Sequence, residues 1–225
     1  MLIVIEGLDG AGKSTQVRLI KEYIKESGRR LEYLHFPRFN ASVYGELIAK
    51  FLRGEFGGNE QVHPQLVALL FAQDRADASA AIKKWLAKGD CVLLDRYVYS
   101  NIAYQCAKLC DRAEAKELKD WIFNLEYEVF AVPKPDVNIF LDVPLSFVNR
   151  KLRENRKGDD REYLKGKDDI HEADMAFQKR VRELYLEQCA EDKDFIRVEC
   201  MDGAGEMLPA GRIFESIKDV IAELL

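Results

Sequence analysis

Short apolar runs alternate along the chain with longer segments in which apolar residues recur every three or four positions. The apolar runs predict strands at residues 2–5, 31–36, 91–94, 137–141 and 195–198. Runs such as "CVLL" and "VNIFL" are apolar at nearly every position, which is typical of strands covered on both faces in a parallel sheet. The helical spacing predicts a first helix that carries Val17, Ile20 and Ile24 and ends near Gly28, and further helices at residues 66–87, 112–129, 144–155, 173–191 and 211–225. We therefore expect an α/β fold, a three-layer sandwich in which helices flank a five-stranded parallel sheet.

Size and composition narrow the class of protein. The 225 residues fit one domain spanning 1–225, because the chain shows no internal repeat and no linker. Hydrophobic residues make up 48% and charged residues 32%, and no apolar run approaches the roughly 18 residues of a membrane span. The N-terminus lacks a basic leader, so we expect a cytoplasmic protein without a membrane partner. A net charge of -5 disfavours nonspecific nucleic-acid binding.

The five cysteines are scattered and form no C-x-x-C pair, which argues against a disulfide framework or a zinc site. We expect them to be buried, small apolar residues. His35 and His63 have no partners at metal or triad spacing, so a structural role is expected for both.

The stretch "GLDGAGKS", residues 7–14, matches the P-loop pattern Gly-x-x-x-x-Gly-Lys-Ser between a predicted strand and a predicted helix. Gly10 and Gly12 allow backbone conformations that aim N–H groups at phosphate oxygens, and the helix adds the positive end of its dipole. Lys13 is expected to reach the β- and γ-phosphates of ATP, and the Ser14 hydroxyl to bind Mg²⁺. The alternative is a glycine-rich turn that binds no ligand. The predicted ATP-binding residues are Gly7, Gly10, Ala11, Gly12, Lys13, Ser14 and Thr15.

Asp95 ends the predicted strand "CVLLD", at the edge where open α/β sheets place functional groups. It is expected to hold the magnesium through water, while Arg96 bridges the donor and acceptor phosphates. A solvated surface ion pair is the alternative for this dipeptide.

Five motifs resemble, in order and spacing, those of thymidylate kinases: "IEGLDGAGKST", "FPR" at 36–38, "LLFAQDRA" at 69–76, "LLDRYVYSNIAYQ" at 93–105 and "PKPD" at 133–136. The resemblance runs from Met1 to about Leu186. It implies transfer of the γ-phosphoryl group of ATP to thymidine monophosphate (dTMP), with Mg²⁺, by a protein that is generally a homodimer. The acceptor could not be inferred from the P-loop alone, because many classes of nucleotide-binding protein share that loop.

The resemblance also assigns the dTMP site. Phe71 and Arg75 lie four residues apart on one helix, so a ring can stack on a base while a guanidinium donates to a base carbonyl. From spacing alone, Phe71 could equally be a core residue. The wall of the site is predicted to comprise Ser100, Asn101, Tyr104 and Gln105, with Asn101 on the base and Tyr104 under the sugar.

At the phosphate end, the resemblance implies that Asp9 contacts the 3′-hydroxyl and the metal shell. The resemblance implies that the guanidinium groups of Arg38 and Arg96 both bind the dTMP phosphate. Phe36, from the same "FPR" stretch as Arg38, is also predicted to bind dTMP. The predicted metal ligands are thus Ser14, Asp95 and Asp9, partly through water.

Residues 150–174 are expected to form a mobile lid. This segment carries the basic residues Arg150, Lys151, Arg153, Arg156, Lys157, Arg161, Lys165 and Lys167. Family members without an arginine at the position of Gly10 use lid residues instead, so Arg153 and Arg156 are the predicted catalytic lid residues beside Lys13, Asp95 and Arg96. A solvated charged loop is the alternative. His171 stands where the family often has tyrosine, and Glu172 fits the acidic neighbour.

Two other functions compete with this prediction. A deoxynucleoside kinase would need a carboxylate base, for which Glu6 is a candidate, but Arg38 would then have no phosphate to hold. A nucleotide-binding regulator would bind nucleotide without transferring phosphate.

Overall fold

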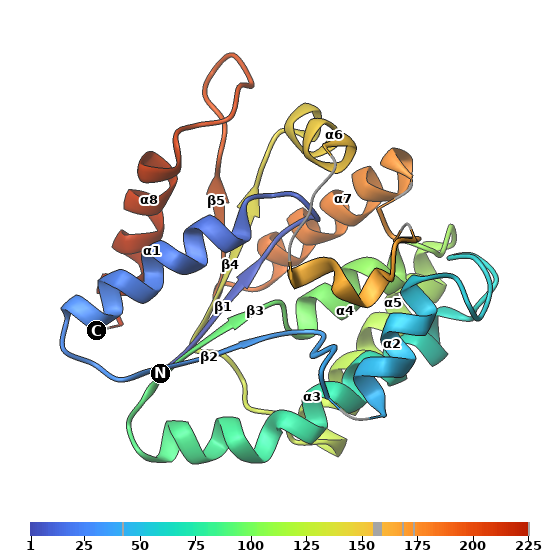
Figure 1. The fold of residues 1–225 in the computed structure, drawn as a ribbon, viewed down its shortest axis with the longest axis horizontal. Helices are drawn as coiled ribbons and strands as arrows, with labels where there is room; N and C mark the ends of the chain where they lie inside the picture. Colours follow the sequence, from blue (N-terminus) through green and yellow to red (C-terminus); the bar gives the residue numbers. More distant parts are fainter. Residues whose placement is uncertain (42, 155–158, 168, 173, 225) are drawn as a thin grey trace.

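Five parallel strands form one sheet in the order β2-β3-β1-β4-β5 (Figure 1). The computed structural model describes residues 1–41, 43–154, 159–167, 169–172 and 174–224, and for residues 159–161 the backbone only. The strands are β1 (Leu2–Glu6), β2 (Leu31–His35), β3 (Cys91–Asp95), β4 (Val137–Asp142) and β5 (Phe195–Glu199). All five lie where the apolar runs predict them, and the prediction of a five-stranded parallel sheet is confirmed.

The helices cover both faces of this sheet. In the described part of the chain they are α1 (Lys13–Glu26), α2 (Tyr44–Leu52), α3 (Pro64–Ala87), α4 (Val98–Cys106), α5 (Arg112–Phe123), the π-helix η1 (Asn124–Val129), α6 (Leu145–Arg153), the 3₁₀ helix η2 (Asp159–Leu164), α7 (Met175–Glu191) and α8 (Ala210–Ala222). Helices α1 and α8 pack together on one face, and α3, α4, α5 and α7 form a layer on the other (Figure 1). The three-layer α/β architecture therefore matches the prediction.

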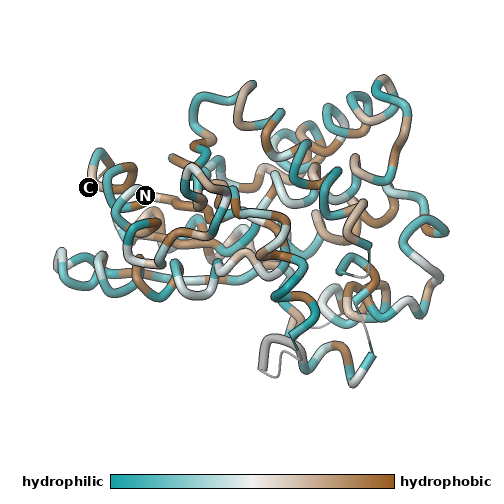
Figure 2. The backbone as a smooth tube through the Cα atoms, turned by 90° about the horizontal axis from the view of Figure 1, so that it is seen from above, coloured by the Kyte–Doolittle hydropathy of each residue, from teal (hydrophilic) through white to brown (hydrophobic). Residues whose placement is uncertain are grey.

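The central strands are the most deeply buried part of the molecule. Every residue of β1, β3 and β4 is buried, whereas the edge strands β2 and β5 are partly accessible. Along the helices, hydrophobic and hydrophilic stretches interleave (Figure 2), as expected of helices that bury one side. Among the described helices, none is long and apolar enough to cross a bilayer.

Several helices differ from the prediction. Helices α2 and α4 were not expected from periodicity, and all nine residues of α4 are buried, so it lacks the charged, solvent-exposed face of an amphipathic helix. The helix expected at 112–129 ends at Phe123 and continues as the π-helix η1. Helix α6 ends at Arg153 because Glu154 is extended, and α7 begins at Met175 behind the Asp174 N-cap.

The cysteines are all free thiols, but the expectation that all are buried is wrong. Cys91, Cys106 and Cys200 are buried, Cys189 is half-buried and Cys110 is exposed, in the turn between α4 and α5.

Candidate active site

A cavity of about 310 Å³ opens at the carboxyl ends of β1, β2 and β3, which place the phosphate loop, His35 and Asp95 at one edge of the sheet. It collects most of the predicted site residues. Those that line it are Asp9, Gly10, Ala11, Gly12, Lys13, Ser14, Thr15, Phe36, Phe71, Arg75, Asp95, Arg96, Ser100, Asn101, Tyr104 and Gln105. Segments from distant parts of the sequence thus meet around a single space.

The phosphate loop joins β1 to α1. Gly10 and Gly12 have φ of 75° and 81°, a left-handed conformation that glycine adopts without steric cost. Lys13 begins α1, and its ammonium donates to the carbonyl oxygen of Leu8 at 2.9 Å and to that of Gly7 at 3.3 Å. Burial, together with the nearby positive charge of Arg96, lowers the pKa of Lys13 to about 8. The loop therefore folds back over its own lysine and presents it beside the cavity.

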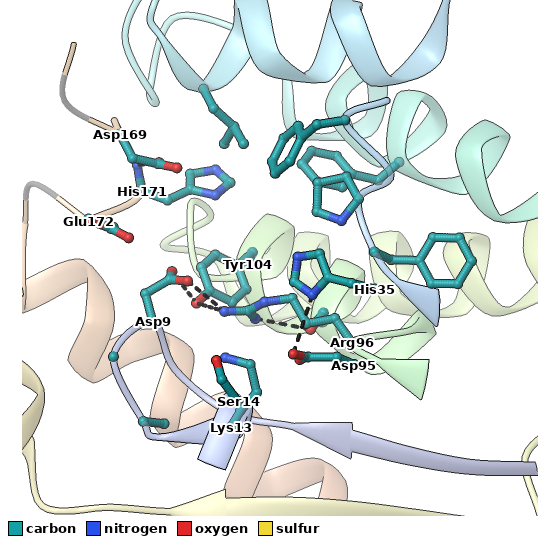
Figure 3. A pocket seen from close by; sticks show the side chains of 18 of the residues that line it. Asp9, Lys13, Ser14, His35, Asp95, Arg96, Tyr104, Asp169, His171 and Glu172 are labelled. Carbon is teal, nitrogen blue, oxygen red and sulfur yellow. Dashed lines mark hydrogen bonds and ion pairs between the residues drawn. The ribbon is translucent and has the colours of Figure 1, made fainter. Parts of the chain in front are cut away.

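Asp95 and His35 end neighbouring strands that lie in register. The His35 Nδ1 atom lies 3.3 Å from Asp95 Oδ2 (Figure 3). Burial raises the pKa of Asp95, but the hydrogen bond from His35 and the charge of Lys13 outweigh it and hold this pKa below its ordinary value. The other oxygen, Oδ1, is buried and has no hydrogen-bond partner among the described residues. Asp95 is therefore an ionised group with one free acceptor at the cavity.

Arg96 is the centre of a polar network beside Asp95. Its Nη2 atom donates to Asp9 Oδ1 at 2.6 Å and to the Tyr104 hydroxyl at 3.3 Å, and its Nη1 atom donates to Ser100 Oγ at 3.2 Å (Figure 3). Its backbone has φ of 67°, which is uncommon for a side-chain-bearing residue, and its N–H donates to the Ile5 carbonyl at 2.9 Å. A strained backbone held at a site is typical of a functional group that must point in one direction.

Tyr104 closes this network by donating to Asp9 Oδ2 at 2.7 Å. Burial disfavours the charged Asp9, but the positive charges of Arg96 and Lys13 outweigh it, so the pKa of Asp9 is lowered. Burial raises the pKa of Tyr104 well above its ordinary value, so the phenol stays neutral. The cavity thus holds a cationic guanidinium that an ionised carboxylate keeps in place.

Helix α3 adds an aromatic and a basic residue to the cavity wall. Phe71 and Arg75 come from α3, and the guanidinium of Arg75 forms a buried ion pair with Glu126 of η1. Asn101 of α4 donates to the same carboxylate at 3.0 Å. Burial disfavours the charged guanidinium, but the negative charge of Glu126 outweighs it and raises the pKa of Arg75.

Glu6 lies beneath the cavity floor rather than in its lining. It is fully buried, and its carboxylate accepts hydrogen bonds from the backbone N–H of Tyr97 at 2.9 Å, from the Tyr185 hydroxyl at 3.0 Å and from the Ser100 hydroxyl. Burial raises the pKa of Glu6. These contacts make Glu6 a support for the first turn of α4, not a group that faces a ligand.

Residues of the predicted lid segment cover the cavity on the side away from the sheet. Tyr163 stacks on Phe39, with ring centroids 3.7 Å apart, and donates to Asp169 at 2.6 Å. His171 packs against Tyr104 with a centroid distance of 5.1 Å. Burial and the negative charge of Asp9 raise the pKa of Asp169 to about 7.

Three of the predicted residues that the structure describes, Gly7, Arg38 and Arg153, do not line the cavity. Arg38 instead contacts α3, donating from Nε to Asp74 at 2.9 Å and from Nη2 to Asp77 at 2.6 Å. Arg153 is exposed at the end of α6, whereas Lys151, another basic residue of the lid segment, lines the cavity. The carbonyl oxygen of Gly7 accepts a hydrogen bond from the Lys13 ammonium. Arg156 lies outside the described residues.

Known proteins share this chain's sequence and fold. The model of a family described as thymidylate kinase matches residues 5–206. A thymidylate kinase of Mycobacterium tuberculosis is 36% identical over 191 residues, covering 85% of this chain and 86% of its own. A probable thymidylate kinase of Thermococcus onnurineus is 38% identical over 193 residues, with 83% and 82% covered. The chain belongs to the thymidylate kinase family.

A solved structure of thymidylate kinase from Candida albicans superimposes on this chain with a TM-score of 0.73 and 26% identity, covering 99% of this chain and 91% of that one. Sequence and fold therefore agree on one family of P-loop enzymes. As a member of the thymidylate kinase family, the chain is a transferase that phosphorylates dTMP with ATP in dTTP synthesis.

Sequence reasoning missed three groups of this kinase site. His35 was expected to be structural, yet it lines the cavity and contacts Asp95. The register of two parallel strands that end together could have revealed this pair. Glu126 lies 51 residues from Arg75 in a helix of unexpected type, and no local pattern indicated it. Lys151 was predicted only as one of the basic residues of the lid, not as one that lines the cavity.

Proposed function

We propose that the cavity holds the phosphates of ATP on the phosphate loop and the first turn of α1, and dTMP between Phe71 and Arg96, so that the two nucleotides meet end to end. One observation carries this assignment: Lys13, Asp95 and Arg96 line the same cavity as Phe71 and Arg75. An aromatic face with a guanidinium fits a base, whereas the cations beside the glycine loop fit phosphates.

Catalysis in this proposal is positioning and charge neutralisation. Lys13 binds the β- and γ-phosphates, and the glycine backbone of the loop donates to their oxygens. Arg96, which Asp9 and Ser100 hold in place, binds the acceptor phosphate and the charge that develops during transfer. A base is scarcely needed, since an acceptor phosphate with a second pKa of about 6 is already ionised near neutral pH.

The residues at the phosphate end also fit Mg²⁺. Asp95 Oδ1 is a buried acceptor with no described partner, the Ser14 hydroxyl lies at the N-terminus of α1, and Asp9 is ionised. No cluster of three acidic, histidine or cysteine ligands is found among the described residues, which agrees with an ion that takes its remaining ligands from phosphates and water. Bound there, Mg²⁺ would neutralise charge on the β- and γ-phosphate oxygens.

The lid assignment is proposed for residues 150–174 of a single domain, 1–225. Lys151 lines the cavity, and a Cβ placed on Gly10 would lie 3.1 Å from Lys151 Cβ, so the loop and α6 touch. This contact supports a basic lid residue acting on the transferred group. Arg153 and Arg156 stay predictions for a closed state of the lid.

In this proposal the guanidinium groups of Arg96 and Arg38 together bind the phosphate of dTMP. Arg38 is tied to Asp74 and Asp77 next to the cavity, so its proposed role requires exchange of one carboxylate for phosphate. Phe36, buried against Tyr97 at 5.9 Å between ring centroids, fixes the strand end from which Arg38 extends.

The structure argues against a deoxynucleoside kinase. Such an enzyme needs a carboxylate base near a 5′-hydroxyl, but Glu6 is buried and is hydrogen-bonded to Tyr97, Ser100 and Tyr185. A regulator that only binds nucleotide would have no use for a second, base-reading end of the cavity.

We further propose a cytoplasmic homodimer. Five free thiols suit a reducing compartment. Large apolar side chains are exposed on α3 and η1, namely Leu66 at 63% and Val129 at 63%, which suits a surface covered by a second copy. Light scattering of the purified protein would show twice the 25.8 kDa chain mass, whereas a monomer would contradict the proposal.

A coupled assay of ADP release tests the function. With ATP and Mg²⁺, dTMP should accelerate ADP release and thymidine should not. Release with thymidine alone would favour the deoxynucleoside kinase, and nucleotide binding without dTMP-stimulated release would favour the regulator.

A further inference from the structure

Glu126 is a carboxylate enclosed by protein at the base-binding end of the cavity. Its exposed fraction is 0%, and it comes from the π-helix that continues α5. The wider winding appears in the hydrogen bond from the Phe130 N–H to the Leu125 carbonyl, a separation of five residues. π-Helical turns recur at functional sites because they redirect a side chain that a regular helix would point elsewhere.

Two neighbours from other helices share this carboxylate. Arg75 of α3 donates to it from Nε and, at 2.6 Å, from Nη2, and Asn101 of α4 donates from Nδ2 to Oε1 at 3.0 Å. A guanidinium held through two parallel hydrogen bonds has a fixed plane. Glu126 therefore sets the orientation of both proposed base-reading side chains.

The hydrogen bonds also fix which atoms remain for a ligand. The two Nδ2 hydrogens of Asn101 are taken by Glu126 and by the Ala68 carbonyl at 3.0 Å, so the amide cannot flip without facing two acceptors with its oxygen. Asn101 Oδ1 points the other way and has no partner among the described residues. For Arg75, no described acceptor binds Nη1. Both residues line the cavity, so Arg75 keeps a donor and Asn101 keeps an acceptor for a bound ligand.

We propose that Glu126 is a specificity-determining residue: by holding Arg75 as a donor and Asn101 as an acceptor, it selects pyrimidines with a 4-keto group over those with a 4-amino group. The inference rests on the proposed dTMP site. Thymine and uracil present an O4 acceptor and an N3–H donor, which complement this pair. Cytosine presents an N4 donor and an unprotonated N3 acceptor. Its N4 donor would face the Arg75 donor, and its N3 acceptor would face the Asn101 acceptor.

Replacing Glu126 by glutamine tests this directly. Glutamine keeps the shape but removes the charge and one of the two acceptor oxygens, so Arg75 and Asn101 lose part of what fixes their orientation toward the base. Since one oriented pair of hydrogen bonds discriminates bases by about 5- to 150-fold, the ratio of kcat/KM for dTMP to that for dCMP should fall by that factor in Glu126→Gln. Most of the change should lie in KM, because the base is remote from the transferred phosphate. Glu128→Gln is the matched control, as Glu128 is exposed on the same helix and pairs only with Lys134 among the described residues.

The outcomes separate the inference from the proposed function. A wild-type protein that does not phosphorylate dTMP would refute the function. A wild-type protein active on dTMP, whose Glu126→Gln variant loses thermal stability but keeps the dTMP-to-dCMP ratio, would overturn the inference and leave the function standing. Glu126→Asp retains the charge and should restore the preference for dTMP.

Breaking a buried ion pair often unfolds a protein, so a further measurement covers that case. Wild-type turnover of dTMP, dUMP and dCMP needs no variant. The inference requires dUMP to be accepted far better than dCMP, since both lack the methyl group and differ at the 4-position. Equal kcat/KM values for dUMP and dCMP would overturn it.

Discussion

Adding a single methyl group at Gly10 separates the backbone role of this glycine from its contact with the lid helix. Gly10 has φ of 75°, and a left-handed conformation costs an alanine about 1–2 kcal/mol. Gly28, at the end of α1, has φ of 77° and no atom within 4 Å of an added Cβ, so Gly28→Ala incurs the same backbone cost alone. For a chain of this size, each variant should unfold about 2–8 °C below the wild type in a thermal melt.

Activity should separate the two variants. In Gly10→Ala the new Cβ would lie 3.1 Å from Lys151 Cβ, closer than such atoms normally pack, so α6 must move by a few tenths of an ångström. Small displacements of groups around a reacting centre are costly, and we expect kcat to fall about tenfold while KM for dTMP changes little. Gly28→Ala should keep its wild-type kcat. Equal kcat values in the two variants would refute a role for the contact between the loop and α6.

Two further predictions follow from shifted pKa values. Burial lowers the pKa of Lys13 to about 8, and ATP binding needs the protonated lysine. The affinity for ATP, measured by calorimetry, should therefore fall about tenfold per pH unit above pH 8. An affinity that stays constant up to pH 9.5 would contradict this prediction. Burial raises the pKa of Asp169 to about 7, so ionising it costs stability as pH rises from its ordinary value through 7. Asp169→Asn should therefore raise the unfolding midpoint of the ligand-free protein more at pH 8 than at pH 5, and an equal shift at both pH values would show that Asp169 is not a buried acid.

Local patterns were sufficient to predict the sheet and the phosphate loop. A strand buried on both faces is apolar at nearly every position, as Cys91–Leu94 of β3 are, and a loop that cradles phosphate needs glycines and a lysine at fixed spacing. The resemblance to a family then identified many of the residues that line the cavity, including Phe71 and Tyr104, but not His35. These features depend on residues close in sequence.

The features that sequence reasoning missed depend on contacts between distant segments. Helix α4 buries all of its residues, polar ones included, between α3, α5 and α7, so no charged, solvent-facing stripe reveals it. Glu126 gains its role from a π-helical turn that brings it to Arg75, and neither residue indicates the other. Which basic lid residue reaches the loop depends on where α6 lies, and the structure brings Lys151 there.

The most direct test of the account is a crystal structure of the protein with dTMP and a non-hydrolysable ATP analogue. We predict that the pyrimidine ring stacks on Phe71 within reach of Arg75, and that both sets of phosphates meet between Lys13 and Arg96. A dTMP molecule bound away from Phe71 and Arg75 would contradict the central claim.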